Sequence, residues 1–325
     1  MRRIAPGVAL TVAVGLVAGL LARVVPLLGA PVLAILLGLV VAAVRRPPAA
    51  AAAGIAFSGK TLLQVAIVLL GTGLGLGQVV RVGGRSLPVM LGTLAVALLG
   101  AVVVGRLLAV SPRLRTLIGV GTGICGASAI AAISGIIAAT STEIAYAISA
   151  IFVFNVVAVL VFPPLGHLLG LSQRGFGLWA GTAVNDTSSV VAAAYAYGHP
   201  AGAYAVVVKL TRTTLIVPIA LALSVVRARS ESGAGVRVAG LVPWFLLWFL
   251  FASALETAGL IRPALHRPLS DAALALITVA LAGVGLSSDL RGMRTIGVRP
   301  LVLGALLWVA VAGVSLGLQA LTHQL

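Results

Sequence analysis

Three ionisable side chains inside apolar segments are the residues best placed to do chemistry in this chain. Asp186 lies within GTAVNDTSSVVAAA (181–194), and Lys209 and Arg212 lie within VVKLTRTTLIVP (207–218). A charged group at membrane depth is costly, so it usually faces a cavity or a partner. Lys209 and Arg212 are three residues apart and share one face of a helix. The pattern predicts a polar site with one carboxylate and two cations.

Two interpretations of these charges stay open. Asp186 could neutralise Lys209 in a structural ion pair, because buried charges are normally paired. One carboxylate cannot neutralise two cations, however, so a net positive charge remains. A transported anion is a natural partner for that charge, and we therefore favour a functional site.

A second feature is the glycine-rich stretch GVGTGICGASAIAA (119–132). Glycine at this density serves close helix packing or an unwound break that lines a cavity. In the second case Ser128 caps a new half-helix, whose N–H groups can bind an anion. The candidate residues are Thr122, Cys125, Gly126 and Ser128. For Cys125, packing against glycine is favoured over a redox role.

The stretch around Asp186 offers the same device. Asn185, Asp186, Thr187 and Ser188 are favourable N-cap types ahead of SVVAAA. The two stretches match at an offset of 60, which pairs Thr122 with Thr182 and Ser128 with Ser188, and Ile130 and Ala132 with Val190 and Ala192. Two half-helix starts near one depth would form a positive polar pocket. Asn155 could reach that cavity, but helix packing is the favoured interpretation.

The elements that must position these residues are membrane-spanning helices. The 325 residues are 61% hydrophobic and 9% charged, and apolar runs of roughly 20 residues recur along the chain. We predict an all-α polytopic membrane protein with about 10–11 transmembrane helices in a single domain, 1–325. The predicted spans are 6–25, 27–44, 60–80, 87–110, 114–139, 144–170, 175–198, 201–226, 240–259, 270–288 and 298–321.

The net charge of +16 fits short basic loops better than a nucleic-acid partner. With a cytoplasmic N-terminus, fifteen Lys and Arg fall in inside segments and five in outside segments. This asymmetry predicts that the N-terminus is inside and the C-terminus outside. LGTGLGLG (70–77) is similar to LAGVGLSS (281–288), seven spans apart, as in inverted repeats. Another match, between GVGTG and GVGLS, gives a different register, so the register stays open.

Enzymatic chemistry has almost no support in the sequence. We find no nucleophile–base constellation, no phosphate-binding Walker loop and no dinucleotide fingerprint. The single cysteine excludes an intramolecular disulfide, and the four histidines lack metal-ligand spacing. We therefore predict a protein that is not an enzyme and has no cofactor and no metal.

The sequence resembles the family of bacterial inner-membrane proteins predicted to be sulfate exporters. GICGASAIAA (123–132), GTAVNDTSSVVAAA (181–194) and VVKLTRTTLIVP (207–218) carry the resemblance, which extends over nearly the whole chain. Asp186, Lys209, Arg212, Cys125 and Ser128 match the family pattern. One position departs from it, because Asn185 stands where a histidine usually precedes the acidic residue.

The resemblance implies membership of the cation:proton antiporter and bile-acid symporter superfamily. It implies inverted repeats, broken crossing helices and a mobile core that moves against a scaffold. Asn185 puts a histidine-based proton relay in doubt. The Asn185–Asp186 pair is instead similar to the ion-binding pair of some sodium:proton antiporters.

Three functional hypotheses follow. The first is a secondary transporter that exports a small inorganic or organic anion, such as sulfate or sulfite, with Asp186 carrying a coupling proton or gating Lys209. The second is a cation:proton antiporter in which Asp186, helped by Asn185 and Thr187, binds Na⁺ or H⁺. The third is a passive channel or a non-transporting membrane scaffold. The expected partners are the lipid bilayer, the anion and a coupling ion; a homodimer is left open.

Overall fold

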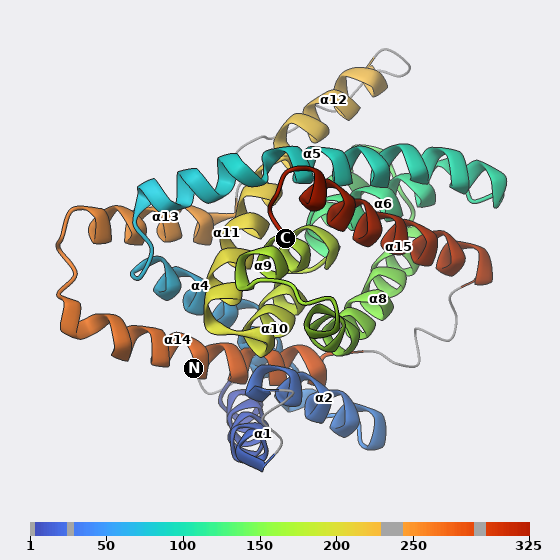
Figure 1. The fold of residues 1–325 in the computed structure, drawn as a ribbon. Coiled ribbons are helices and arrows are strands. Elements are labelled where there is room, and N and C mark those ends of the chain that lie inside the picture. The colour runs from blue at the N-terminus through green and yellow to red at the C-terminus, as the bar shows by residue number, and fades with distance from the viewer. Residues whose placement is uncertain (1–3, 25–28, 229–242, 289–296) are drawn as a thin grey trace. The chain divides into compact units, whose positions relative to one another are not determined.

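A computed structural model of the protein describes residues 4–24, 29–228, 243–288 and 297–325, and the regular elements in these ranges are helices (Figure 1). The prediction of an all-α polytopic membrane protein is confirmed. Seven helical segments in the described ranges are long and apolar enough to cross a membrane. They are Ala5–Val24, Ala49–Gly71, Leu76–Leu107, Ser141–Leu168, His199–Val225, Pro263–Leu286 and Val298–Leu321.

The other four predicted spans correspond to shorter helices. Two of them are the apolar helices α2 (Gly29–Val44) and α13 (Trp244–Thr257). The segments predicted at 114–139 and 175–198 are each divided into two helices. These are α6 (Pro112–Gly123) with α7 (Ala127–Ser134), and α9 (Gln173–Ala183) with α10 (Thr187–Tyr197).

The long segments carry the remaining labels. They are α1 (Ala5–Val24), α3 (Ala49–Phe57), the π-helix η1 (Ser58–Leu62), α4 (Leu63–Gly71), α5 (Leu76–Leu107), α8 (Ser141–Leu168), α11 (His199–Thr214), α12 (Ile216–Ala228), α14 (Pro263–Leu286) and α15 (Val298–Leu321). α3, η1 and α4 form one uninterrupted run.

Two predicted boundaries were wrong in the first third of the chain. The stretch between the predicted spans 27–44 and 60–80 contains a further helix, α3, which begins at Ala49 directly after Pro48. Its alanines have the highest intrinsic helix propensity, and proline is tolerated at a helix start. Lys60 follows α3 and lies in η1. The gap between the predicted spans 60–80 and 87–110 is also helical, and its Arg81 and Arg85 lie in α5. The count of fifteen inside and five outside assigned these three residues to loops, whereas they lie in helices, and the orientation stays a prediction.

The chain divides into two compact units, which we describe separately. Unit 1 comprises Met1–Val82, Val191–Ala203 and Trp244–Leu290. Unit 2 comprises Gly83–Val190, Tyr204–Pro243 and Arg291–Leu325. Helices α5, α10 and α11 contribute residues to both. The single membrane domain stays a prediction.

Glycines bring the helices of unit 1 into close contact. α14 packs on α2, α1 and α4, and α1 packs on α3. A Cβ atom at Gly38 of α2 or at Gly285 of α14 would lie 3.0 Å from the Cα of the other residue. A Cβ at Gly54 would likewise lie 2.7 Å from the Cα of Gly7. Such small-residue contacts are typical of helices that associate in lipid.

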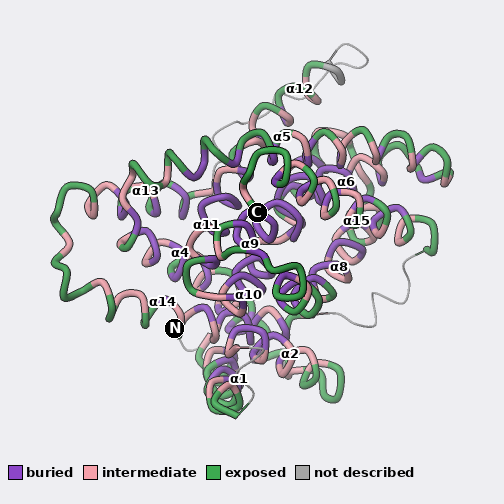
Figure 2. The backbone as a smooth tube through the Cα atoms, viewed as in Figure 1, coloured by how far each residue is buried: buried purple, intermediate pink, exposed green. Residues whose placement is uncertain are grey.

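Unit 2 has a core that includes α6 and α9, the helices that lead into the two breaks. α6 packs against α7, α8 and α15, and α9 packs against α15. In α9 the stretch from Gly175 to Ala183 is buried throughout (Figure 2). Trp179 stacks on Phe162 with ring centroids 4.0 Å apart, and its Nε1 donates to the Ala312 carbonyl. The helices α6 and α9, which lead into the two breaks, are therefore held in a packed core.

Candidate functional site

The break between α6 and α7 is a three-residue interruption. α6 ends at Gly123, Ile124 leaves the helical conformation with φ −123° and ψ −88°, and α7 begins at Ala127. Gly126 has a φ of +67°, which side-chain-bearing residues rarely adopt, and a Cβ atom at this position would lie 3.4 Å from the Cβ of Asp186. The predicted break is confirmed, but the N-cap residue is Gly126 and not Ser128, because the helix starts earlier.

The break between α9 and α10 is stabilised by two side chains. Val184 is extended, with ψ 131°, and α10 begins at Thr187. The N–H groups of Asn185 and Asp186 both donate to Oδ1 of Asn155, each at 3.2 Å. Oδ2 of Asp186 accepts from the N–H of Ser188 at 3.0 Å and from the Ser188 hydroxyl. Asp186 therefore caps α10, as the residue types predicted.

The two breaks are equivalent at the offset of 60 found in the sequence. α6 ends at Gly123 and α9 at Ala183, while α7 begins at Ala127 and α10 at Thr187. We call residues 122–127 and 182–187 together the double break. Both segments belong to unit 2.

Lys209 and Arg212 hold equivalent carbonyl groups of the two breaks. Nζ of Lys209 donates to the carbonyls of Ile124 and Val184, each at 2.9 Å. Arg212 donates through Nη1 to the carbonyl of Thr182 and through Nη2 to that of Thr122 at 3.4 Å. Each cation thus joins residues that are 60 apart in the chain. Both side chains are fully buried.

The charges of the double break follow the helix dipoles. A helix carries partial negative charge at its C-terminal end and partial positive charge at its N-terminal end. Lys209 and Arg212 lie at the C-terminal ends of α6 and α9, whereas Asp186 lies at the N-terminal start of α10 and against Gly126. Opposite charges therefore meet at both kinds of helix end.

The predicted residues differ in exposure. Asn185, Ser188, Thr122, Cys125 and Gly126 are buried with the two cations. Three others are accessible: Asp186 and Thr187 are half-buried, and Ser128 is exposed. The accessible charge of the double break is thus a carboxylate.

One predicted interaction is absent from the structure. Among the described residues, no ion pair joins Asp186 to Lys209, since the Lys209 amine is bonded to two carbonyls instead. The structural ion pair considered above is therefore wrong. Cys125 follows Ile124 in the first break, where it is buried and forms no disulfide.

Several buried polar atoms around the double break have no hydrogen-bond partner within the described chain. They are Oγ1 of Thr122, Nε of Arg212, and both amide atoms of Asn185. Buried polar groups are normally satisfied, so each such atom calls for an explanation.

Asn155 binds the second break, a role that the sequence did not indicate. Its carboxamide oxygen serves two backbone N–H groups at the break, and no local motif announces this long-range contact. We expect Asn155→Ala to destabilise the protein by about 2–4 kcal/mol, because each orphaned buried donor costs about 1–3 kcal/mol. Thermal unfolding in detergent, followed by tryptophan fluorescence, measures this effect.

Asn155→Asp provides the matched variant, since it keeps an acceptor at the same position. It should retain more stability than Asn155→Ala. Equal stability of Asn155→Ala and the wild type would contradict the role of Asn155 at the break.

Taken together, fold and site define a polytopic helical membrane protein in which two broken helices are joined by buried cations. The chain belongs to the family described as Conserved hypothetical protein 698, whose model matches residues 6–304.

Relatives in streptococci match nearly the whole chain. A UPF0324 membrane protein of Streptococcus agalactiae serotype V is 41% identical over 324 residues, which cover 97% of both chains. One from Streptococcus pyogenes serotype M6 is 44% identical over 326 residues, covering 97% of this chain and 96% of the relative. One from Streptococcus mutans serotype c is 42% identical over 328 residues, with the same coverage. These names agree with the membrane architecture.

Proposed function

We propose that the protein is a secondary transporter that exports a small anion of the sulfate or sulfite type across the bacterial inner membrane. One observation carries the proposal: the double break holds two fully buried cations against one carboxylate. The carbonyls at the ends of α6 and α9 offset the excess formal positive charge only with partial charges, so the double break can still attract an anion. The resemblance of the three sequence motifs to predicted sulfate exporters supplies the substrate class.

The proposal assigns different tasks to the charges. Lys209 and Arg212 donate hydrogen bonds to carbonyls, so they attract the anion mainly through their charge. The start of α7 has no side-chain cap, and helix starts of this kind bind anions. We place the anion at the start of α7, beside Ser128 and Asp186.

Asp186 then provides the coupling. The Cα and Cβ of Asp186 lie beside Gly126, at the start of α7, and in this proposal its negative charge repels an anion bound there. Protonation removes this repulsion, so the proton and the anion bind together. This linkage makes transport of the anion depend on the proton gradient.

Ligand binding to the purified protein tests the proposal. Thermal shift and calorimetry would use sulfate, sulfite, thiosulfate, small carboxylates, Na⁺ and Li⁺, each across pH. We expect one of the anions to stabilise the protein, with stronger binding at lower pH. No response to any anion would refute the anion transporter. In proteoliposomes, anion counterflow distinguishes a carrier from a passive channel.

A cation:proton antiporter is the second candidate. Two observations favour it: Asp186 is half-buried and therefore accessible, and Lys209 and Arg212 are already bonded to backbone carbonyls. Stabilisation by Na⁺ or Li⁺ that disappears in Asp186→Asn, without any response to anions, would establish this function instead.

A further inference from the structure

Helix α9 leads into the second break, between α9 and α10, and is bonded to α15 at two points. Nε1 of Trp179 donates to the carbonyl of Ala312 at 3.1 Å, and the hydroxyl oxygens of Thr182 and Ser315 lie 2.7 Å apart. Both contacts join residues that are 133 apart in the chain, so α9 and α15 run in the same direction here. Two bonds about one helical turn apart fix the register of α9 along α15.

The contact with Ser315 belongs to a chain of buried hydrogen bonds. Thr182, Ser315 and Gln319 are all fully buried. Nε2 of Gln319 donates to the Ser315 hydroxyl at 3.1 Å, and the Thr182 hydroxyl donates to the Leu178 carbonyl at 2.7 Å. Because a hydroxyl has one hydrogen, all three contacts are satisfied together only when Ser315 donates to Thr182. Gln319 therefore orients the Ser315 hydroxyl toward the end of α9.

Thr182 connects this chain to the buried cations. Its side chain accepts from Ser315, and its carbonyl accepts from Nη1 of Arg212. Further along the second break, Asn155 accepts from two backbone N–H groups and Asp186 caps α10. The second break is therefore held by side chains from α8, α11 and α15 and by its own cap.

The first break, between α6 and α7, lacks the equivalent anchor. Thr122 corresponds to Thr182 at the offset of 60, yet its buried hydroxyl has no hydrogen-bond partner in the described chain. α6 meets α15 in an apolar cluster that contains Leu117 and Leu303. Apolar packing is non-directional, so it fixes a register less tightly than hydrogen bonds do. α7 also begins without a side-chain cap, so the two breaks are held unequally.

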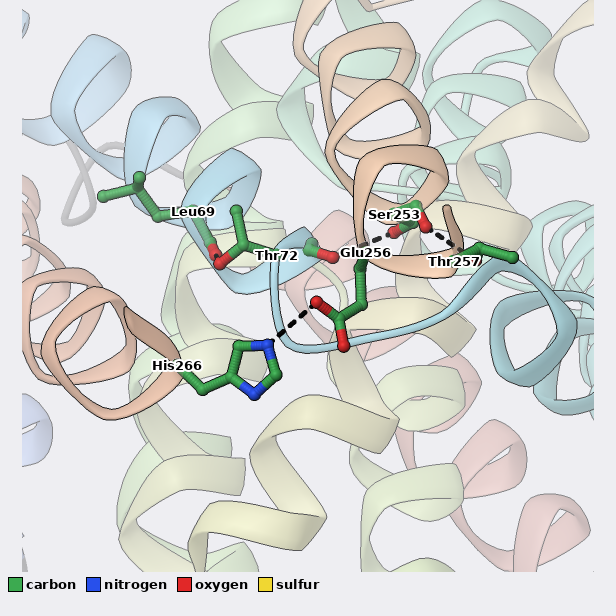
Figure 3. A network of polar contacts seen from close by, with 7 residues as sticks. Leu69, Thr72, Ser253, Glu256, Thr257 and His266 are labelled. Carbon is green, nitrogen blue, oxygen red and sulfur yellow. Dashed lines mark hydrogen bonds and ion pairs between the residues drawn. The ribbon is translucent and has the colours of Figure 1, made fainter. Parts of the chain in front are cut away.

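A buried serine anchors a helix end in unit 1 in a similar way. The hydroxyl of Ser253, on α13, donates to the carbonyl of Gly71 at the end of α4, at 3.2 Å, in the network that Figure 3 shows. Ser253 is fully buried, as Ser315 is. Since Ser253 belongs to unit 1 and the double break to unit 2, Ser253 provides a reference for Ser315.

We propose that Ser315 and Gln319 are positioning residues of the double break. They fix the second break on α15, and the first break is the half that moves when the site opens and closes. Both residues act through Thr182, whose backbone places Arg212. The inference concerns how the two breaks are held, so it does not depend on the proposed function or on the charge of the transported ion.

Hydrogen–deuterium exchange of the full chain in detergent, followed by mass spectrometry, tests the inference on the wild type. Protection factors in the first break, at 123–128, should be about fivefold lower or more than those in the second break, at 183–188, the factor that one further hydrogen bond provides. Local opening of this kind is what amide exchange measures. Equal protection of the two segments, or stronger protection of the first, overturns the inference.

Variants assign the protection of the second break to α15. Ser315→Ala and Thr182→Val remove the contact between the two hydroxyls, and exchange at 183–188 should become about fivefold faster with less change at 123–128. Thr182→Ser keeps the hydroxyl and should retain the protection. The matched control Thr122→Val removes a hydroxyl that has no partner at the equivalent position, so both segments should exchange as in the wild type.

Ser253→Ala separates anchoring from a general loss of stability. It removes an equally buried serine contact in unit 1 and should leave exchange at 183–188 unchanged. Equal acceleration of 183–188 and 123–128 in Ser315→Ala overturns the inference, because a protein that is only destabilised opens in both segments. Acceleration of 183–188 by Ser253→Ala to the same extent overturns it as well. Gln319→Leu should act in the same direction as Ser315→Ala, and wild-type exchange in that variant would overturn the role of Gln319.

Discussion

Replacing Lys209 by methionine is expected to lower the free energy of unfolding by about 2–4 kcal/mol. Each charge-assisted hydrogen bond that is lost contributes about 1.5–3 kcal/mol of stability. Removing the buried charge also removes its desolvation cost, which offsets part of this loss. The substitution keeps the aliphatic volume but leaves the carbonyls of Ile124 and Val184 without their donor. Both carbonyls lie at helix ends, where no intrahelical partner is available. Thermal or denaturant unfolding in detergent, followed by tryptophan fluorescence, measures the change.

Lys60 provides the matched control. It is exposed in η1, so Lys60→Met should change stability by no more than about 0.5 kcal/mol. Equal stabilities of Lys209→Met and Lys60→Met would show that Lys209 does not hold the two breaks together.

Arg212 extends the experiment to a double-mutant cycle. Lys209 and Arg212 each join α6 to α9, through carbonyls two residues apart. Residues that hold the same elements show non-additive effects, so the double variant Lys209→Met, Arg212→Met should lose less than the sum of the single variants. Strict additivity would mean that the two cations act independently.

The broken helices could be predicted from the sequence because their signals are local. Glycines at 119–126 and N-cap residues at 185–188 mark the ends of helices by conformational preference alone. The offset of 60 between Thr122 and Thr182 also proved structural, since Arg212 bonds both of their carbonyls. Local chemistry and internal repetition therefore located the two helix breaks.

The partners of the buried charges could not be predicted in the same way. A sequence displays side chains, so Asp186 was the obvious partner for Lys209. Every residue has a backbone carbonyl that can accept a hydrogen bond, so the amino-acid sequence does not show which carbonyls at a helix end are bonded to a side chain. The role of Asn155 could not be predicted either, because its partners are two backbone N–H groups in a distant segment. Long-range bonds to the backbone emerge only when the helices are packed.

Asp186→Asn is expected to reduce anion flux driven by a pH gradient at least 100-fold in proteoliposomes, while the fold is retained. Asparagine has the same shape and is an equally good N-cap, so its amide oxygen can still accept from the N–H of Ser188. It cannot bind and release a proton, so the linkage between proton and anion disappears. Radiolabelled sulfate efflux under an imposed pH gradient measures the loss.

Binding should respond in the opposite direction to flux. The carboxylate repels an anion at the start of α7, and about 1–3 kcal/mol of repulsion corresponds to roughly 5- to 150-fold in affinity. Asp186→Asn should therefore bind the anion more tightly at high pH and lose the pH dependence of binding. Asp271→Asn, at an exposed carboxylate of α14, is the control and should behave like the wild type. Wild-type flux in Asp186→Asn would remove Asp186 from the coupling mechanism, because a side chain that cannot titrate would then support the same proton-driven movement.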